Sequence, residues 1–485
     1  MKLLSCLVGC ASLVLAATTG VEACDFSQGP CHIPLVNPKY LAHKIEIQNQ
    51  LAKVPTTGIV RHRKRQITIN PLSGTGDTGG TLFAYHGQLL VGTPPQKFDI
   101  LFDTGSQQLW LQSTTTKGGI NAAGTLFDPS KSSTFKDTKR PASSIEYVDG
   151  TTVEGVLVQD VVSINNLTVP DLIFELATSI TSTTSDMDGI MGMSFSLPAT
   201  AAAPNQPTYF ERLVSDKKVT SPVFSYYIDN SNMGGGLTLG GVDSARMQGT
   251  PVTIPVAASG NDASGKPVYL FWQSVLNSVS FAGSPQKLTM APNFAVVFDT
   301  GTSLAVLPVA VARTLNTALN FVKARQSEPS ADLYVMDCSN GKIPSGLPDI
   351  SFDFGGIALT VTPQEYIFFQ SGNQPGQVAC VSGFAGQDLS SGTTGKPGDT
   401  QALLPSAIFG NVFLRRFYTV FNLGEHKMEF AIAERSTNVN TSLSGGGSSG
   451  SPGASPSGSA NAGYRPDFCW MGPIATSLLA ALLAF

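Results

Sequence analysis

The stretch FDILFDTGS at residues 98–106 has a near copy, FAVVFDTGTS, at residues 294–303. Each copy is an apolar run that ends in Asp-Thr-Gly, and the two aspartates, Asp103 and Asp299, are 299 − 103 = 196 residues apart. A single Asp-Thr-Gly is a weak signal, because these residues also suit ordinary turns. Two copies after two apolar runs are a stronger signal, because a carboxylate at the end of a buried strand is costly unless it is satisfied or used.

The chain repeats a second, shorter pattern after each copy. DGIMG at residues 188–192 follows the first aspartate, and AIFG at residues 407–410 follows the second. Two such halves indicate a duplication with pseudo-twofold symmetry, which would bring the equivalent loops together where the halves meet. We therefore expect Asp103 and Asp299 to lie side by side.

Two neighbouring carboxylates predict acid–base chemistry. Like charges at hydrogen-bond distance do not both ionise easily, so the pair shares one proton and the pKa of one member rises. The ionised member can activate a water molecule, while the protonated member donates to a carbonyl oxygen. Gly105 and Gly301 would let the neighbouring carboxylate come close, because they have no side chain. The expected supporting hydroxyl groups are those of Ser106 and Thr302 at the outer carboxylate oxygens and those of Thr104 and Thr300 between the loops.

Length and composition indicate a two-lobed β protein. The chain has 485 residues, too many for one ordinary core, and only 13% of them are charged. Short apolar or alternating runs separated by Gly, Pro, Asn and Asp fill residues 82–433, which is typical of an all-β fold with few helices. The helical candidates are residues 207–215 and 308–320, the second with its proline in an N1-like position. We expect an N-terminal lobe over residues 66–250 and a C-terminal lobe over residues 251–435.

The N-terminal segments predict a secreted precursor. Residues 1–23, the signal peptide and the start of the leader, contain an apolar run too short to span a bilayer; a buried helix is the alternative. Residues 24–65 form a basic leader that ends at Lys64-Arg65, a pair that kexin-like proteases cut; a solvated basic loop is the alternative. The leader has seven Lys and Arg against two Asp and Glu, or +5, whereas residues 66–435 have 21 against 30, or −9. Electrostatic attraction would hold the leader on the body.

Secretion permits two modifications. Of the seven cysteines, Cys24 and Cys31 could pair within the leader, and Cys338 and Cys380 are the only two in the body. We expect Cys338 and Cys380 to be bonded; two free buried thiols are the alternative. Glycosylation is expected at the sequon residues Asn166 and Asn440.

The C-terminal residues predict a tether. Residues 436–461 are rich in Ser and Gly and form a flexible stalk that cannot bury a core. Residues 462–485 continue with a polar or mixed spacer and an apolar end, the pattern of a glycosylphosphatidylinositol attachment signal that is removed, with Asn461 as the attachment residue. A transmembrane helix is the alternative, but an apolar end of 12 residues would span only about 18 Å of a bilayer core of about 30 Å.

An ordered series of motifs resembles the pepsin-type aspartic endopeptidases over nearly all of residues 82–433. Besides the two aspartate loops, the series includes LLVGTPPQKFDI, FDPSKSSTF, DGIMGM, LTLGGVDSARMQG and AIFGNVFLRRFYTVFNLGEHKMEFAIA. The resemblance implies an all-β, bilobal double β-barrel with pseudo-twofold symmetry and Asp103 and Asp299 as the catalytic pair. It also implies polypeptide substrates, a monomeric enzyme and hydrolysis without a metal or other cofactor.

The resemblance assigns further residues around the cleft. It implies that Tyr147 lies on a β-hairpin flap, with Asp149, Gly150 and Thr151 at its tip, and that Trp110 supports the tyrosine from below. From the residues alone, Tyr147 would instead be a packed strand aromatic.

The signal peptide, dibasic site, pepsin-like body, stalk and anchor signal together resemble the yapsin-like surface proteases of fungi. The leader resembles the basic prosegment of the pepsin-type family, which inhibits the enzyme by placing a lysine against the catalytic carboxylates. Lys39 is the candidate here, with Lys44 and Lys53 as rivals. The protein would then be a zymogen whose lipid anchor holds it outside the plasma membrane or in the cell wall. The rival function is a surface binding or wall-organising protein that keeps the fold without turnover.

Other chemistries lack their residues. Only His86 and His426 remain after removal of the leader, and the sequence has no H-E-x-x-H zinc motif. The G-x-S-x-G match at residues 446–450 lies in the stalk, with no strand or helix around it. The acidic body has no basic patch interleaved with aromatic residues, so we expect no nucleic-acid partner.

Overall fold

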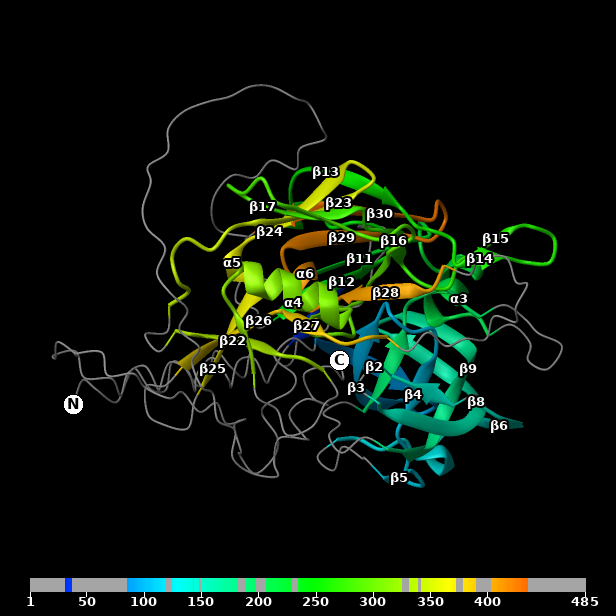
Figure 1. Ribbon diagram of the computed structural model, residues 1–485. Coiled ribbons are helices and arrows are strands. Elements are labelled where there is room, and N and C mark those ends of the chain that lie inside the picture. Colours follow the sequence, from blue (N-terminus) through cyan, green and yellow to red (C-terminus); the bar gives the residue numbers. More distant parts are fainter. Residues whose placement is uncertain are drawn as a thin grey trace, which may run out of the picture.

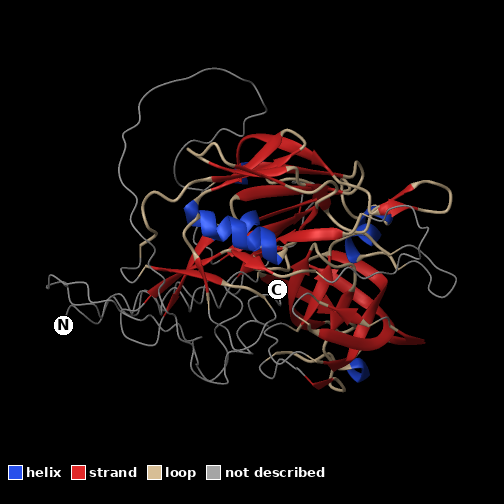
Figure 2. Cartoon of the chain, viewed as in Figure 1, coloured by secondary structure: helices blue, strands red, loops and turns tan. Residues whose placement is uncertain are grey.

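The computed structural model describes residues 31–36, 85–118, 124–142, 144–147, 150–181, 188–197, 206–228, 234–324, 331–338, 342–371, 378–389 and 403–434. The signal peptide, most of the leader, the stalk and the anchor signal lie outside these residues. Strands dominate the described chain, as the sequence predicted (Figures 1 and 2). Within these ranges no helix is both long enough and apolar enough to cross a membrane.

The strands of the first half pair in the order β2-β3-β10-β4-β9-β8-β6 within a 15-stranded sheet, and β2 also pairs with β8. Its longest hairpin joins β8 to β9 through a turn at Asn165, whose φ of 52° is a left-handed conformation that asparagine tolerates. The bounds are β2 (His86–Val91), β3 (Gln96–Asp103), β4 (Leu109–Leu111), β5 (Lys117–Gly118), β6 (Lys136–Pro141), β7 (Ile145–Glu146), β8 (Thr152–Ile164), β9 (Leu167–Ile180), β10 (Gly189–Gly192), β11 (Val223–Ile228) and β12 (Gly234–Leu239).

The second half forms three sheets of its own, β16-β19-β28-β20-β27, β18-β17-β23-β24 and β21-β22-β26-β25, and a small hairpin, β14-β15. The bounds are β13 (Met247–Pro255), β14 (Gly260–Asn261), β15 (Pro267–Val268), β16 (Gln273–Val275), β17 (Ser278–Phe281), β18 (Lys287–Thr289), β19 (Ala295–Phe298), β20 (Ala305–Leu307), β21 (Val322–Lys323), β22 (Tyr334–Asp337), β23 (Ile350–Phe354), β24 (Ile357–Val361), β25 (Ile367–Ser371), β26 (Val378–Ser382), β27 (Phe384–Gly386), β28 (Pro405–Phe409), β29 (Phe417–Asn422) and β30 (Lys427–Ala433).

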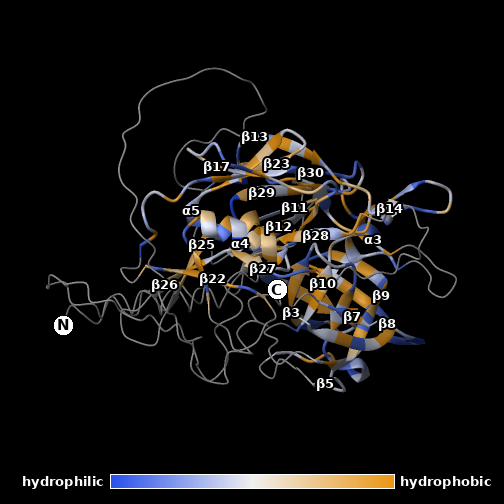
Figure 3. Ribbon diagram, in the orientation of Figure 1, coloured by the Kyte–Doolittle hydropathy of each residue, from blue (hydrophilic) through white to orange (hydrophobic). Residues whose placement is uncertain are grey.

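The strand order confirms the predicted duplication. In the first half, neighbouring strands are alternately antiparallel and parallel along the run β2-β3-β10-β4-β9. In the second half, the same alternation of antiparallel and parallel pairs occurs along the run β16-β19-β28-β20-β27. The short repeats DGIMG and AIFG supply β10 and β28, each parallel to the strand that carries or precedes an aspartate. Figure 3 shows the neighbourhood of β3 and β10 coloured mainly as hydrophobic, and every residue of β10 is buried.

A central run of strands, β13-β30-β29-β11-β12-β1, joins the two halves. β11 from the first half pairs with β29 from the second, and the rings of Phe224 and Phe421 stack with centroids 4.8 Å apart. The strand β1 (Cys31–Val36) belongs to the predicted leader and pairs antiparallel with β12 along its whole length. The leader therefore contributes a strand to the sheet that connects the halves.

Helices are few and short. α3 (Tyr209–Ser215) fulfils the prediction for residues 207–215, and Thr208 and Glu211 close it with a capping box. α4 (Val309–Ala318) fulfils the second prediction, except that Pro308 is the N-cap residue and not N1. The remaining short helices are α5 (Pro363–Tyr366), α6 (Asn411–Leu414), η1 (Pro129–Lys131) and η2 (Ser244–Arg246).

The predicted disulfide is present. Cys338 follows β22, Cys380 lies in β26, and their Cα atoms are 5.6 Å apart. Both residues are buried, so the bond joins the neighbouring strands β22 and β26 in the interior of the second half.

Candidate active site

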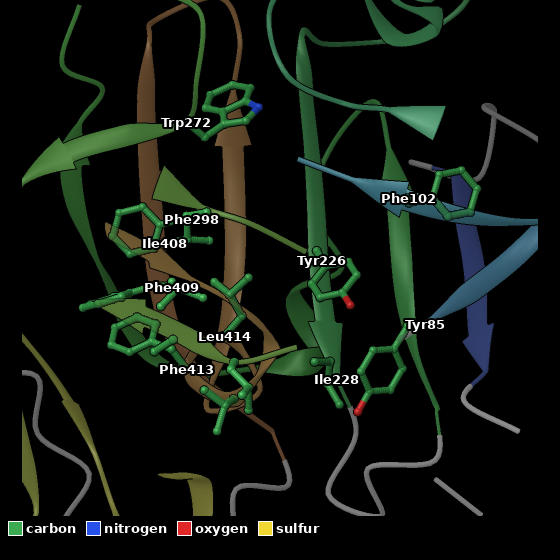
Figure 4. Packing of buried hydrophobic residues seen from close by; sticks show 14 of the residues in the cluster. Tyr85, Phe102, Tyr226, Ile228, Trp272, Phe298, Ile408, Phe409, Phe413 and Leu414 are labelled. Carbon is green, nitrogen blue, oxygen red and sulfur yellow. The ribbon is translucent and has the colours of Figure 1, made fainter. Parts of the chain in front are cut away.

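The two aspartates end equivalent strands at the centre of the molecule. Asp103 is the last residue of β3, and Asp299 directly follows β19. Phe102 and Phe298, the residues before them, are buried in the apolar core shown in Figure 4. Asp103 and Asp299 are only 4% and 7% exposed, so both acids are buried at the ends of buried strands.

The hydrogen bonds to the two carboxyl groups mirror each other. Asp103 Oδ1 accepts the N–H of Gly105 at 2.7 Å, and its Oδ2 accepts the hydroxyl of Ser106. Asp299 Oδ1 accepts the N–H of Gly301 at 2.7 Å, and its Oδ2 accepts the hydroxyl of Thr302 at 2.7 Å. Each loop thus supplies one backbone donor and one hydroxyl donor to its own aspartate. These bonds fix both carboxylate planes before any substrate arrives.

The glycines bring the two carboxyl groups together. A Cβ atom on Gly105 would lie 2.5 Å from Asp299 Cγ, and one on Gly301 would lie 2.5 Å from Asp103 Oδ1. Real Cβ atoms do not approach other atoms so closely, so each loop needs a glycine where the opposite carboxyl group passes. The pKa of Asp103 is raised well above its usual value. Burial is the largest cause, and the charge of Asp299 and a hydrogen bond with Asp299 add to it because the two carboxyl groups are so close.

Two threonines tie the loops across the symmetry axis. The hydroxyl of Thr104 donates to Phe298 O at 2.8 Å and accepts the N–H of Thr300 at 2.9 Å. The hydroxyl of Thr300 donates to Phe102 O at 2.6 Å and accepts the N–H of Thr104 at 3.0 Å. All four bonds are buried, so they lock the relative position of the two aspartates.

The structure places three of the four flap residues named from the resemblance in a tight turn. Tyr147 N–H donates to Thr151 O at 2.8 Å, and Gly150, with φ of 85°, donates to Tyr147 O at 2.9 Å. Trp110 Nε1 donates to the Tyr147 hydroxyl at 2.7 Å. Asp149 lies outside the described residues. The tyrosine ring also packs against the small cluster around Trp110, so the packed aromatic expected from the residues alone is present as well.

Sequence reasoning missed one residue of this site. Asn411 is fully buried at the start of α6, where its Nδ2 donates to Thr300 O at 2.8 Å and its Oδ1 accepts the hydroxyl of Tyr226 at 3.1 Å. It therefore supports the Asp299 loop from behind. Tyr226, its partner, is one of the buried residues labelled in Figure 4. The available signal was position: Asn411 directly follows Gly410, the end of the second short repeat.

The other predicted residues lie apart from the aspartates. Asn166 is exposed in the turn between β8 and β9, a position accessible to a glycan. Asn440, Asn461 and Lys39 lie outside the described residues. Among the residues that the structure describes, no group of three or more His, Cys, Asp or Glu could hold a metal ion.

Two mirrored Asp-Thr-Gly loops that meet across duplicated β-sheets define the class of the aspartic peptidases. The chain belongs to the eukaryotic aspartyl proteases, because the model of that family matches residues 84–433. Rhizopuspepsin-4 of Rhizopus niveus is 32% identical over 349 residues, which cover 71% of this chain and 76% of the relative. Vacuolar protease A of Neurospora crassa is 29% identical over 354 residues, 72% of this chain and 79% of the relative. Gastricsin of Homo sapiens is 30% identical over 355 residues, which cover 72% of this chain and 81% of the relative. The protein is therefore an aspartic endopeptidase.

Proposed function

We propose that Asp103 and Asp299 are the catalytic pair and that the enzyme hydrolyses extended polypeptides at acid pH. The observation that carries this proposal is the mirrored set of donors that holds two adjacent buried carboxyl groups. The raised pKa of Asp103 keeps one proton on the pair, and the protonated carboxyl group donates to the carbonyl oxygen of the scissile bond. The ionised carboxyl group is the base that takes a proton from the attacking water.

The flap completes the site in this mechanism. A substrate strand lies beneath Tyr147, whose hydroxyl is held by Trp110, and the flap excludes bulk water when it closes. A drier site strengthens the interaction between the carboxyl pair and the charge that develops on the scissile carbonyl. Water attacks directly, so no covalent enzyme intermediate forms.

Hydrolysis of a peptide at acid pH by the leader-free protein tests the pair. Asp103→Asn and Asp299→Asn should each lower kcat/KM at least about a hundredfold, because each removes an acid–base group. Asp262→Asn is the matched control, since Asp262 is exposed in the β14-β15 turn. Ordinary turnover by either active-site variant would refute the assignment. A folded wild-type protein without turnover would favour the rival function, a binding or wall-organising protein.

We also propose that the enzyme is made as a secreted zymogen and tethered at the cell surface, as in the yapsin-like proteases that the whole sequence resembles. The support is the order of segments: an apolar start, a basic leader, an acidic body, a Ser/Gly stalk and an apolar end. The leader would inhibit the site until the cut after Arg65.

The tether can be tested on whole cells. When the full-length sequence is expressed, phosphatidylinositol-specific phospholipase C should release the processed protein from the cells, and a chain ended at residue 435 should reach the medium without treatment. Retention of both forms in the cell would contradict surface tethering.

A further inference from the structure

Two glycines mark equivalent positions behind the two aspartate loops. Gly192 N–H donates to Gln108 O at 2.9 Å, and Gly410 N–H donates to Leu304 O at 3.1 Å. The two acceptors are 304 − 108 = 196 residues apart, which is also the separation of the two aspartates. The residues that directly follow these glycines can therefore be compared between the halves.

The residues at this next position differ in their chemistry. The first half has Met193 and the second half has Asn411. Both are buried, but the thioether of methionine has no hydrogen to donate, whereas the amide of asparagine has both a donor and an acceptor. The hydrogen bonds to the two carboxyl groups mirror each other, so the symmetry of the site is broken one layer behind them.

The amide of Asn411 joins a buried tyrosine to the loop of Asp299. The carbonyl oxygen of Thr300 can only accept a hydrogen bond, so the NH2 group of Asn411 must face it, at 2.8 Å. The amide oxygen is thereby left for the hydroxyl of Tyr226, which donates to it at 3.1 Å. Thr300 O belongs to the same peptide group as Gly301 N, which donates to Asp299 Oδ1 at 2.7 Å. A continuous series of hydrogen bonds therefore runs from Tyr226 to Asp299.

Each bond in this series strengthens the next. An amide whose carbonyl oxygen accepts a hydrogen bond becomes more polarised, so its N–H becomes a better donor. The effect amounts to about 10–30% per bond, and hydrogen bonds are stronger where water is excluded. Tyr226, Asn411 and Thr300 are each at most 2% exposed. The series therefore makes the Gly301 N–H a stronger donor to the carboxylate of Asp299.

The tyrosine stays a donor at every pH at which the carboxyl pair titrates. Burial, and then the charges of Tyr85 and Asp299, raise the pKa of Tyr226 well above its usual value. The titratable groups that interact with Asp299 or Tyr226 come from three elements: Asp103 at the end of β3, Tyr226 itself in β11, and Tyr85 just before β2. Helix α6, which carries Asn411, has the sequence NVFL and no titratable side chain. Because neither tyrosine ionises in acid, Asp103 titrates together with Asp299 there.

We infer that Asn411 and Tyr226 are positioning residues that favour the ionised form of Asp299 and thereby set the pH range in which the carboxyl pair works. The inference rests on the proposed function and adds two residues to it. Both residues are buried, so they act through the peptide group between Thr300 and Gly301 and not on the substrate. The stronger donor helps Asp299 wherever the shared proton lies, so the series lowers the sum of the two apparent pKa values of the pair.

The pH profile of kcat/KM tests this role in the leader-free enzyme. Its acid limb and its neutral limb report the two apparent pKa values. Asn411→Met gives the second half the residue of the first half, so we expect the sum of the two values to rise by about 0.3–0.6 units. At a fixed pH on the limb that moves, this is a twofold to fourfold change in kcat/KM, by about tenfold per unit. Tyr226→Phe keeps the ring and removes only the first donor, and it should raise the sum by about half as much.

Tyr366→Phe is the matched control. Tyr366 is as deeply buried as Tyr226, and its hydroxyl donates to Pro348 O at 2.8 Å and not to an aspartate loop. This variant also loses one buried hydroxyl bond, but it should keep the apparent pKa values of the wild type. A merely structural role of Tyr226 and Asn411 would lower kcat/KM equally at all pH values, and that result would overturn the inference.

The limb that moves carries further information. A shift of the acid limb supports the inference and places the charge of the singly ionised pair on Asp299. A shift of the neutral limb also supports it and places that charge on Asp103. If Asn411→Met does not fold, Tyr226→Phe decides alone, and apparent pKa values equal to those of the wild type would refute the role of the series.

Failure of the proposed function is a separate result. A folded wild type without turnover would mean that the pair does not cleave peptides. The series is then tested by carbon-13 NMR titration of the two carboxyl groups, with signals assigned from Asp103→Asn and Asp299→Asn. Identical titration curves in the wild type and in Tyr226→Phe would refute it, and a higher sum of the two apparent pKa values in the variant would support it.

Discussion

The buried threonine ties between the two loops yield a prediction that can be worked from their geometry. Thr300→Val removes the hydroxyl that donates to Phe102 O at 2.6 Å and accepts from Thr104 N at 3.0 Å. Valine keeps the shape, so a carbonyl and an N–H are left buried without partners. Each such group costs about 1–3 kcal/mol, so we expect the free energy of unfolding to fall by about 2–6 kcal/mol.

Urea unfolding followed by tryptophan fluorescence measures this change, and peptide hydrolysis measures its effect on the site. Thr250→Val is the matched control, because Thr250 is exposed in β13. We expect kcat/KM of Thr300→Val to fall by about a hundredfold, since small displacements of reacting groups carry large costs. If the free energy of unfolding lies within about 0.5 kcal/mol of the control, the ties do not hold the halves and the reasoning is wrong.

Three further predictions concern the flap support, the buried acid and the disulfide. Trp110→Phe removes the 2.7 Å bond to the Tyr147 hydroxyl, worth about 1 kcal/mol, so kcat/KM should fall about fivefold; an unchanged value would dismiss this support. Burial raises the pKa of Glu175, a residue of β9, from its ordinary value of 4.5 to about 8. Its contribution to stability is therefore complete below pH 4.5 and is lost as the pH rises towards 8, by about 1.4 kcal/mol per pH unit. Glu175→Gln should flatten that slope in urea titrations, and an unaltered slope would assign it to other groups. Replacing Cys338 and Cys380 by serine opens a loop with a sequence separation of 42, which should lower the free energy of unfolding by about 4 kcal/mol; a loss below about 1 kcal/mol would contradict the chain-entropy argument.

The features that could be predicted from the sequence include those for which the same local motif occurs in both halves of the chain. An apolar run before Asp-Thr-Gly and two apolar residues before a glycine occur in both halves, and they became β3 with β10 and β19 with β28. Helix α3 was predictable because Thr208 and Glu211 form a capping box ahead of apolar residues.

Features that depend on pairing between distant strands were not predictable. Glu175 stands in the stretch LIFELATS, where alternation alone does not reveal that its neighbours are Trp110 and Leu157. A register shift between Glu154 and Gly155 adds to this, because it changes which residues of β8 face β9. Likewise, nothing in CHIPLV shows that this leader segment pairs with the glycine-rich β12.

The crossed contacts at Gly105 and Gly301 affect how the two halves can change in evolution. Each glycine clears a path for an acid that the other half of the gene encodes. A side chain gained in one copy would therefore displace the carboxyl group of its counterpart, and no compensating change within the same copy would relieve it. The outer strands of the two repeats can diverge independently, but the glycine of each repeat can change only if the aspartate of the other repeat changes with it.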